Sequence, residues 1–205
     1  MINIEKIISF DMDQNCYLVY GDSKEGFLLD PGYDTMKILK ACEKSCVNVT
    51  HFLLTHCHYD HIYSVNELRG HKKLICGEEC SKNMGKASYN LSAGVGMPFT
   101  VEPADLTVSD GSDFVIGGMK IKAISTPGHT SCCFCYLVED CLFSGDTLFR
   151  QNVGRWDLPT GDENTLKRSI KEKLFLLPDD TKVYCGHGAD TTIGYEKKYN
   201  FYVSE

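Results

Sequence analysis

The sequence predicts an α+β protein in which strands and helices alternate along 205 residues. Short apolar or alternating runs, bounded by Gly, Pro, Asn and Asp, are typical of strands, and longer segments with apolar residues at helical spacing are typical of amphipathic helices. The expected strands are 2–9, 15–20, 27–29, 49–54, 113–116, 119–124, 134–138, 141–143 and 182–185. The expected helices are 35–45, 62–68 and 164–177, followed by a polar helix near the C-terminus.

In the first half, three strand segments separated by polar residues and glycine predict a meander. The segment 35–45 carries apolar residues at helical spacing and lysines on its other face, which predicts a helix with one buried side. Strand 49–54 runs directly into the motif THCHYDH, and helix 62–68 follows. The motif is therefore expected at the C-terminal end of a buried strand.

In the second half, turn signals GG and ED separate the strands, and Pro178 ends helix 164–177. Three strands end in chemically rich turns, with the sequences STPGHT, SGDTLF and GHG. Before them, the segment 85–103 has no regular pattern and is rich in Gly, Ser, Asn and Pro. Unstructured loops of this length are uncommon in compact domains and often cover a binding site.

Composition narrows the possible classes of protein. With 42% hydrophobic and 24% charged residues, we expect a single globular domain over residues 1–205. The net charge of −7 argues against a nucleic-acid partner held along its phosphates, so a small-molecule substrate is expected. The N-terminal segment lacks the basic flank and apolar run of a secretory signal, and no window approaches a membrane span. We therefore expect a cytoplasmic protein without membrane attachment.

The 11 cysteines are expected to be free thiols, because their number is odd and no export signal is present. Cys57 lies between two histidines of THCHYDH, and by strand alternation its side chain should point away from them into the core.

Four turns or strand ends carry side chains of the types that bind metals. The candidate ligands are His56, His58, Asp60, His61, His129, Asp146 and His187. A lone HxH motif is often structural, but five of the seven histidines fall in these turns, which makes coincidence improbable. The other two, His51 and His71, are interpreted as structural. Imidazole and carboxylate suit zinc, iron and manganese, and a water bridging two such ions becomes hydroxide near neutral pH. The sequence thus predicts a binuclear metal-dependent hydrolase.

The motifs resemble those of the metallo-β-lactamase superfamily, and in particular its small glyoxalase II-like (hydroxyacylglutathione hydrolase-like) members. The resemblance spans nearly the whole chain through LLDPG, THCHYDH, TPGHT, SGDTLF, GRWDLPTGD, LPDDTKVYCGHG and TTIGYEK. It implies a four-layer αββα sandwich with the metals at one edge. It also implies a first ion held by His56, His58 and His129, a second held by Asp60, His61 and His187, and a bridging Asp146.

The resemblance further implies a thioesterase with two zinc ions, iron or manganese being alternatives, that attacks a small thioester with a metal-bridging hydroxide. A thiolate leaves with little proton assistance, which suits a motif set without an evident general acid. Asp60 is expected to orient the hydroxide as a catalytic residue, and Arg155 to contact substrate. Full-length glyoxalase II proteins have an additional helical C-terminal domain that is not expected here, so the thiol carrier stays open, and loop 85–103 is expected to select the substrate.

Three other functions stay open from the sequence. Sulfur (persulfide) dioxygenases resemble the same branch but use a single iron. The substrate could also be another ester or a lactone. Finally, the chain could be a metal-binding or interaction protein without catalytic activity. Bound-metal analysis and a substrate panel would separate these functions.

Overall fold

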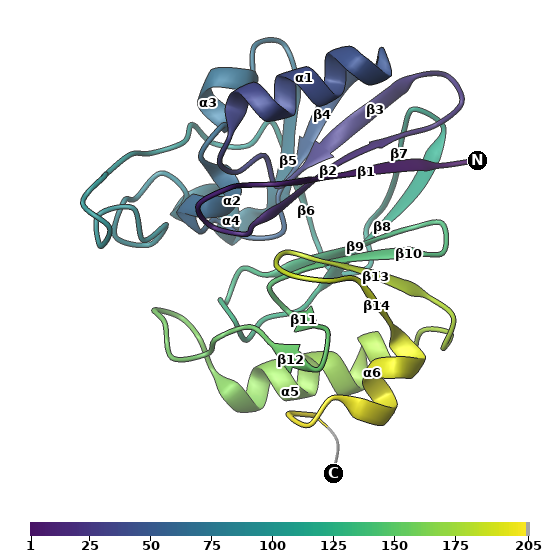
Figure 1. Cartoon of the computed structure of the whole chain (residues 1–205). Helices are drawn as coiled ribbons and strands as arrows, with labels where there is room; N and C mark the ends of the chain where they lie inside the picture. The colour runs from purple at the N-terminus through teal and green to yellow at the C-terminus, as the bar shows by residue number, and fades with distance from the viewer. Residues whose placement is uncertain (204–205) are drawn as a thin grey trace.

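Two six-stranded sheets pack face to face, and helices cover the outer surface of each sheet (Figure 1). The computed structural model describes residues 1–203. The four-layer αββα sandwich predicted from the sequence is confirmed. None of the helices in this range is both long and apolar enough to cross a membrane.

The first sheet has the order β1-β2-β3-β4-β5-β6. Its strands are β1 (Asn3–Ile8), β2 (Asn15–Tyr20), β3 (Glu25–Leu29), β4 (Asn48–Leu53), β5 (Lys73–Gly77) and β6 (Leu106–Val108). The predicted meander is present, because β1, β2 and β3 pair antiparallel. From β3 onward the pairs are parallel, so the C-terminal ends of β3, β4 and β5 lie at one edge of the sheet.

The second sheet has the order β14-β13-β10-β9-β8-β7. Its strands are β7 (Asp113–Ile116), β8 (Met119–Ser125), β9 (Phe134–Val138), β10 (Cys141–Gly145), β13 (Lys182–Cys185) and β14 (Thr191–Thr192). Strands β10 and β13 are parallel, so both end at the same edge. A small hairpin of β11 (Leu148–Phe149) and β12 (Asn152–Val153) follows β10.

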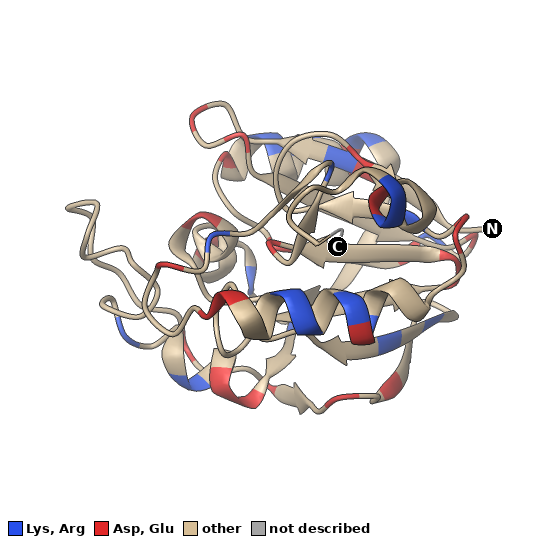
Figure 2. Ribbon diagram, turned by 90° about the horizontal axis from the view of Figure 1, so that it is seen from below, with Lys and Arg blue, Asp and Glu red and all other residues tan. Residues whose placement is uncertain are grey.

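The helices complete the outer layers. They are α1 (Thr35–Ser45), α2 (Tyr59–Ile62), α3 (Val65–Leu68), α4 (Glu78–Asn83), α5 (Glu163–Glu172), the 3-10 turn η1 (Leu174–Leu176) and α6 (Ile193–Tyr199). In α5, Leu166 and Ile170 are buried while charged residues line the outer surface (Figure 2). Asp162 caps this helix by accepting a hydrogen bond from the Thr165 amide.

The core between the sheets is built from the inward-facing residues of both. Tyr17 and Phe27 of the first sheet and Tyr136 and Phe143 of the second are almost fully buried. The rings of Tyr17 and Phe143 meet edge to face, with centroids 5.2 Å apart. This contact joins β2 to β10 and fixes the distance between the sheets.

The structure differs from the predicted elements where segments are short. Strands β5 and β6, helix α4, the β11–β12 hairpin and β14 were not predicted, since two to six residues carry too little periodicity. The predicted helix 62–68 is two short helices, and the predicted helix 164–177 ends as an α-helix at Glu172 and continues as η1. Side-chain packing in clusters of buried residues, rather than local sequence pattern, selects these short elements.

Asp105 joins β5 to the segment that leads into β6. Its carboxylate accepts hydrogen bonds from the Leu74 amide at 2.9 Å and from Arg69 at 3.0 Å, with Lys73 at 3.3 Å. The Leu74 bond first, and then the two cations, lower the pKa of this carboxyl to about 2. Stabilisation from a lowered carboxyl pKa is present above the unfolded value near 4 and is lost as the pH falls toward 2.

We expect Asp105→Asn to reduce the free energy of unfolding by about 1 kcal/mol at pH 6, since the group is partly exposed and screened by water. The difference from the unsubstituted protein should shrink to near zero at pH 2. Urea unfolding of both proteins at a series of pH values measures it, and a difference that stays constant with pH would contradict the role of the carboxylate.

Candidate metal centre

The predicted ligand residues meet at the edge of the sandwich where strands from both sheets end. The HxHxDH segment follows β4, His129 lies between β8 and β9, Asp146 follows β10, and His187 follows β13. Because β10 and β13 are parallel, their C-terminal ends deliver side chains to the same place. The first sheet delivers the HxHxDH segment from the facing side.

The HxHxDH segment changes from extended backbone to helix at His58, which is the N-cap of α2. The rings of His56 and His58 lie 4.7 Å apart, as the predicted alternation requires. Asp60 and His61 lie in the first turn of α2, and the His61 ring is 4.2 Å from that of His56. One short segment therefore supplies side chains to two neighbouring groups of donors.

The first group consists of His56, His58 and His129. Each offers one ring nitrogen, and the three nitrogens lie within 4.8 Å of one another. The Nδ1 atom of His58 and the Nε2 atom of His129 are 2.9 Å apart. All three residues are buried.

The second group consists of Asp60, His61 and His187, whose donor atoms also lie within 4.8 Å of one another. The Nε2 atoms of His61 and His187 are 3.3 Å apart, and the Asp60 Oδ2 atom is 3.3 Å from the His187 Nε2 atom. These two groups are the sets of residues that the resemblance implies for two ions, and Asp30, His56 and His61 form a third group whose donor atoms are equally close.

Asp146 lies between the groups. Its Oδ1 atom is 3.3 Å from the His61 Nε2 atom, and its Oδ2 atom is 3.7 Å from His129 Nε2 and 3.6 Å from His187 Nε2. Gly186 makes this approach possible, because a Cβ atom at that position would lie 2.2 Å from Asp146 Oδ1. A carboxylate so placed faces both groups at once.

Hydrogen bonds orient the histidine rings. His129 donates from Nδ1 to the Arg155 carbonyl at 2.7 Å, and His61 donates from Nδ1 to Asp30 at 2.9 Å. The His56 Nδ1 atom is 3.0 Å from the Thr55 hydroxyl oxygen, whose own proton is donated to Asp30. In a neutral ring held in this way the Nε2 atom carries the lone pair, and in all three residues Nε2 is the ring nitrogen left to face the centre.

The protonation states suit metal ligation. Burial, followed by the neighbouring histidines, holds the pKa of His56 well below its usual value, and burial with His129 nearby lowers the pKa of His58 to about 4. Burial alone would raise the pKa of the Asp146 carboxyl, but His61 and the other histidines hold it well below the usual range. Burial opposes a charged His61, yet the surrounding Asp146, Asp60 and Asp30 raise its pKa well above the usual value, so this position favours a cation.

Two buried atoms test whether metal ions fit this centre. The His56 Nε2 and Asp146 Oδ1 atoms have no hydrogen-bond partner within the described part of the chain. A buried polar atom without a partner is costly, and a bound cation would satisfy both atoms. Five imidazoles and two carboxylates form a donor set that suits zinc, iron or manganese.

Asp30 supports the centre, and the sequence analysis did not assign it a role. This fully buried carboxylate accepts hydrogen bonds from the Thr55 amide at 2.7 Å, the Thr55 hydroxyl at 2.6 Å and the His61 ring at 2.9 Å. An ionisable residue at the end of the apolar run FLLD was the signal that could have identified it. Thr55 lies beside the HxHxDH motif, and its hydroxyl group contacts a histidine of the centre, His56.

The other candidates have separate environments. Cys57 points away from the centre into the core, as predicted, with its sulfur 3.8 Å from that of Cys132, and all 11 cysteines are free thiols. His51 contacts Thr50 in strand β4, away from the centre. Arg155 lies beside the centre, but its guanidinium forms two bonds with Asp157, at 2.9 and 3.0 Å.

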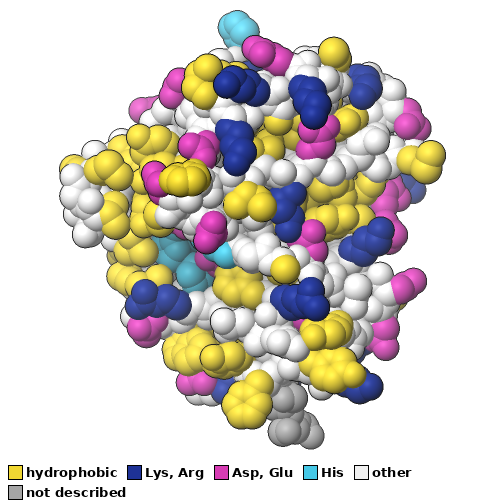
Figure 3. Space-filling view, in the orientation of Figure 1, with side chains coloured by type: hydrophobic (Ala, Val, Ile, Leu, Met, Phe, Trp, Pro, Cys, Tyr) yellow, Lys and Arg dark blue, Asp and Glu magenta, His cyan; other side chains and the backbone are white. Residues whose placement is uncertain are grey.

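A cavity of about 570 Å³ opens onto the centre. Its base contains five of the predicted ligands, namely His58, Asp60, His129, Asp146 and His187. Figure 3 shows histidine at the surface on the left of the molecule, bordered by hydrophobic side chains. The volume is that of a small-molecule site.

A family model described as the metallo-beta-lactamase superfamily matches residues 10–187. The chain therefore belongs to the metallo-β-lactamase superfamily, as its motifs predicted.

The proteins similar to this chain include hydrolases. The chain is 32% identical to hydroxyacylglutathione hydrolase GloC of Haemophilus influenzae, over 97% of each chain. Among solved structures, BLEG-1 B3 metallo-beta-lactamase matches with a TM-score of 0.94 at 32% identity, over 99% of this chain and 100% of the other. TTHA1623 in a di-iron-bound form matches with a TM-score of 0.83 at 28% identity, over 97% and 99%. The chain is thus a member of the superfamily of metallo-hydrolase type, and its structure brings together His and Asp side chains that could bind metal.

We expect Asp30→Asn to weaken metal binding about 10- to 100-fold, because an amide cannot accept bonds from Thr55 and His61 in the same arrangement. Metal affinity is measured by competition with a chromophoric chelator. Asp22→Asn, which removes an exposed carboxylate that contacts the N-terminal ammonium, is the matched control. Equal affinities in the two variants would show that Asp30 does not support the ligands.

Proposed function

We propose that the protein is a binuclear metal-dependent hydrolase that cleaves a small thioester, as glyoxalase II-like enzymes do. The observation that carries the proposal is the pair of three-donor groups with Asp146 between them, at the base of an open cavity. We propose His56, His58 and His129 for one ion, and Asp60, His61 and His187 for the other. The similarity to GloC along nearly the whole chain supports the choice of a thioester.

Two metal ions, when bound, supply Lewis acidity and a water nucleophile near neutral pH. The chain itself positions the donors: Asp30, Thr55 and the Arg155 carbonyl hold three imidazole rings in fixed orientations. Burial of those rings keeps water from competing for their lone pairs.

Asp60 is the proposed catalytic carboxylate. It lines the cavity, and its Oδ2 atom faces His187 at 3.3 Å, so it can orient a nucleophilic water by accepting a hydrogen bond. Its pKa is lowered, although burial alone would raise it, because His61 and His187 lie beside it. An ionised Asp60 is therefore an acceptor near neutral pH. The leaving thiolate needs little protonation, which suits a cavity whose acidic groups are ionised ligands.

The native metal is proposed to be zinc, with iron or manganese as the alternatives. The di-iron form of TTHA1623 shows that a similar fold holds two iron ions in that protein. A persulfide dioxygenase with one iron is the alternative function, and the two donor groups favour the binuclear hydrolase over it.

The test is a substrate panel with protein loaded separately with zinc, iron and manganese. The panel contains thioesters, lactones, a phosphodiester, a persulfide and a β-lactam, the last because BLEG-1 is named a β-lactamase. Bound metal is counted per chain, and oxygen consumption is followed with the persulfide. Thioester hydrolysis with two ions per chain supports the proposal, whereas oxygen consumption with one iron would replace it with the dioxygenase.

We expect Asp146→Ala to reduce thioester hydrolysis by more than about 100-fold, because its carboxylate contacts both donor groups and removal of mere supporting residues already costs up to about that much. Steady-state kinetics on metal-loaded protein measure the loss, and circular dichroism checks the fold. Asp22→Asn serves again as the control. Unchanged activity in Asp146→Ala would show that this residue has been wrongly assigned.

A further inference from the structure

Loop 85–103 contributes to the lining of the cavity and carries no charged residue over most of its length. No Asp, Glu, Lys, Arg or His occurs between Lys86 and Glu102. The loop projects at the left of Figure 1, and the same region is uncoloured in the charge view of Figure 2. Leu91 and Val95 are its apolar side chains that line the cavity.

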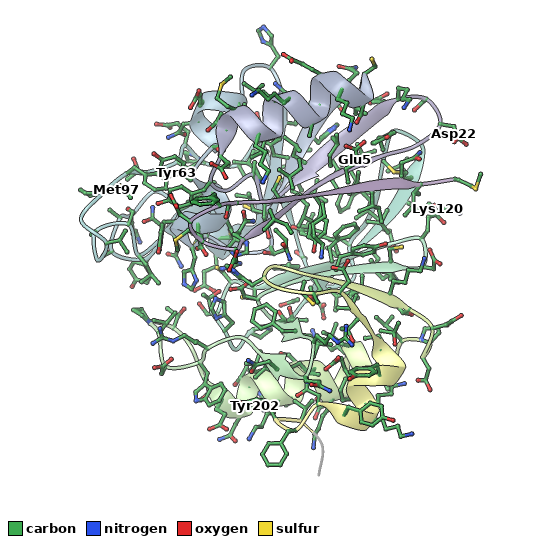
Figure 4. The ribbon with its side chains drawn as sticks, viewed as in Figure 1. Glu5, Asp22, Tyr63, Met97, Lys120 and Tyr202 are labelled. Atoms are coloured by element: carbon green, nitrogen blue, oxygen red, sulfur yellow. The ribbon has the colours of Figure 1, made fainter. Side chains whose placement is uncertain are left out.

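The loop is anchored by buried polar residues at its base. The Asn90 side chain donates to the carbonyls of Met84 at 3.2 Å and Phe99 at 2.9 Å, and the main-chain carbonyl of Asn90 accepts from the Tyr59 amide. Ser92 also bonds to both backbone groups of Phe99. These bonds tie the loop to the HxHxDH segment, next to the centre. Figure 4 shows Met97 farther out on the loop.

Leu91, between these two anchors, has a left-handed backbone with a φ of 65°. A leucine in this conformation costs free energy that glycine would avoid. The leucine side chain lines the cavity, so it is held next to the centre despite this cost. Strained residues that persist at a site often serve that site.

The opposite wall carries apolar side chains as well. Phe149, Val153 and Leu158 of the segment that follows Asp146 line the cavity there, and Asn152 and Arg155 are the polar residues of that segment in the lining. The lining contains one Lys or Arg side chain, Arg155, and its exposed guanidinium donates two hydrogen bonds to Asp157, whose charge offsets that of the cation. A substrate carboxylate that approaches the remaining N–H groups of Arg155 therefore also approaches the Asp157 carboxylate.

We propose that Leu91 is a specificity-determining residue that contacts substrate, and that the cavity selects a thioester with an uncharged, apolar arm over a multiply charged carrier such as glutathione. This inference rests on the proposed function for the thioester itself. An apolar arm between these residues leaves water and gains free energy, whereas a carboxylate placed there is desolvated beside a cation whose charge Asp157 already offsets.

Two substrate series locate the arm. In one, the acyl group grows from acetyl to butyryl and hexanoyl on N-acetylcysteamine. In the other, the acyl group stays acetyl and the thiol changes from N-acetylcysteamine to benzyl thiol. We expect kcat/KM to rise about tenfold or more with apolar size in one series, and the best apolar substrate to exceed S-lactoylglutathione. A rise in neither series, or a preference for S-lactoylglutathione, would overturn the inference while leaving the thioesterase in place.

Leu91→Gly tests the residue itself. We expect it to lower kcat/KM about tenfold for the best apolar substrate, mainly through KM, and to change S-acetyl-N-acetylcysteamine less than about threefold. The melting temperature should stay near that of the parent, because glycine relieves the left-handed backbone while adding entropy to the unfolded chain. Cys46→Gly is the matched control, since Cys46 has a φ of 51° at the end of α1. Equal losses on both substrates would indicate a structural role for Leu91.

Binding of the thioether S-hexyl-N-acetylcysteamine, which cannot be hydrolysed, separates this inference from the proposed function. We expect calorimetry to show binding with a negative heat-capacity change that Leu91→Gly weakens about tenfold. If no thioester is cleaved but this binding is present, the proposed function fails and the apolar pocket stands. If thioesters are cleaved but the thioether binds no better than S-methylglutathione, the pocket assignment fails.

Discussion

The arrangement of the centre depends on one buried carboxylate. Asp30 ends strand β3 and accepts the amide and hydroxyl of Thr55, which follows β4, together with the ring N–H of His61. A buried anion is tolerated when several donors surround it, and here three donors do so. The same three bonds join the ends of two parallel strands and direct two imidazole rings, His61 directly and His56 through Thr55. The same three hydrogen bonds thus stabilise the fold at this edge and set the geometry of the centre.

Burial then prepares the side chains chemically. Removal from water opposes charge on His56 and His58, so both present lone pairs near neutral pH, while adjacent histidines keep Asp146 ionised. The result is a cluster in which the His56 and His58 rings disfavour protons, while the acidic neighbours of His61 favour positive charge at that position. Such a cluster is unfavourable unless a cation enters, which explains why the His56 Nε2 and Asp146 Oδ1 atoms lack partners among the described residues. Metal affinity and local instability of the empty centre have the same origin.

The sequence predicted the layers and the seven residues that meet, because each of those residues lies in a recognisable turn directly after a strand. It did not predict the short elements β5, β6 and α4, which depend on contacts between distant segments. It also missed Asp30, whose turn was recognised but whose partners come from 25 and 31 residues away. The left-handed backbone of Leu91 has no local signal at all, since glycine or asparagine would be the ordinary choice. Sequence pattern identifies the residues that meet at the centre because they occur in clustered motifs, and it misses the residues that support them because these are scattered along the chain.

The residues proposed for the reaction and the residues proposed for substrate selection lie in different parts of the molecule. The donors stand on strand ends and on the first turn of α2, which the two sheets hold rigidly, whereas the cavity walls come from loop 85–103 and the segment after Asp146. Loops can change sequence and length without disturbing strand ends, so substrate preference can change while the centre stays intact. In this chain, however, the Asn90 carbonyl bonds to the Tyr59 amide inside the HxHxDH segment, so the wall is attached to the centre. A substrate that repositions the loop would therefore also act on the turn that carries Asp60 and His61, and the pocket can influence the reaction through this single hydrogen bond.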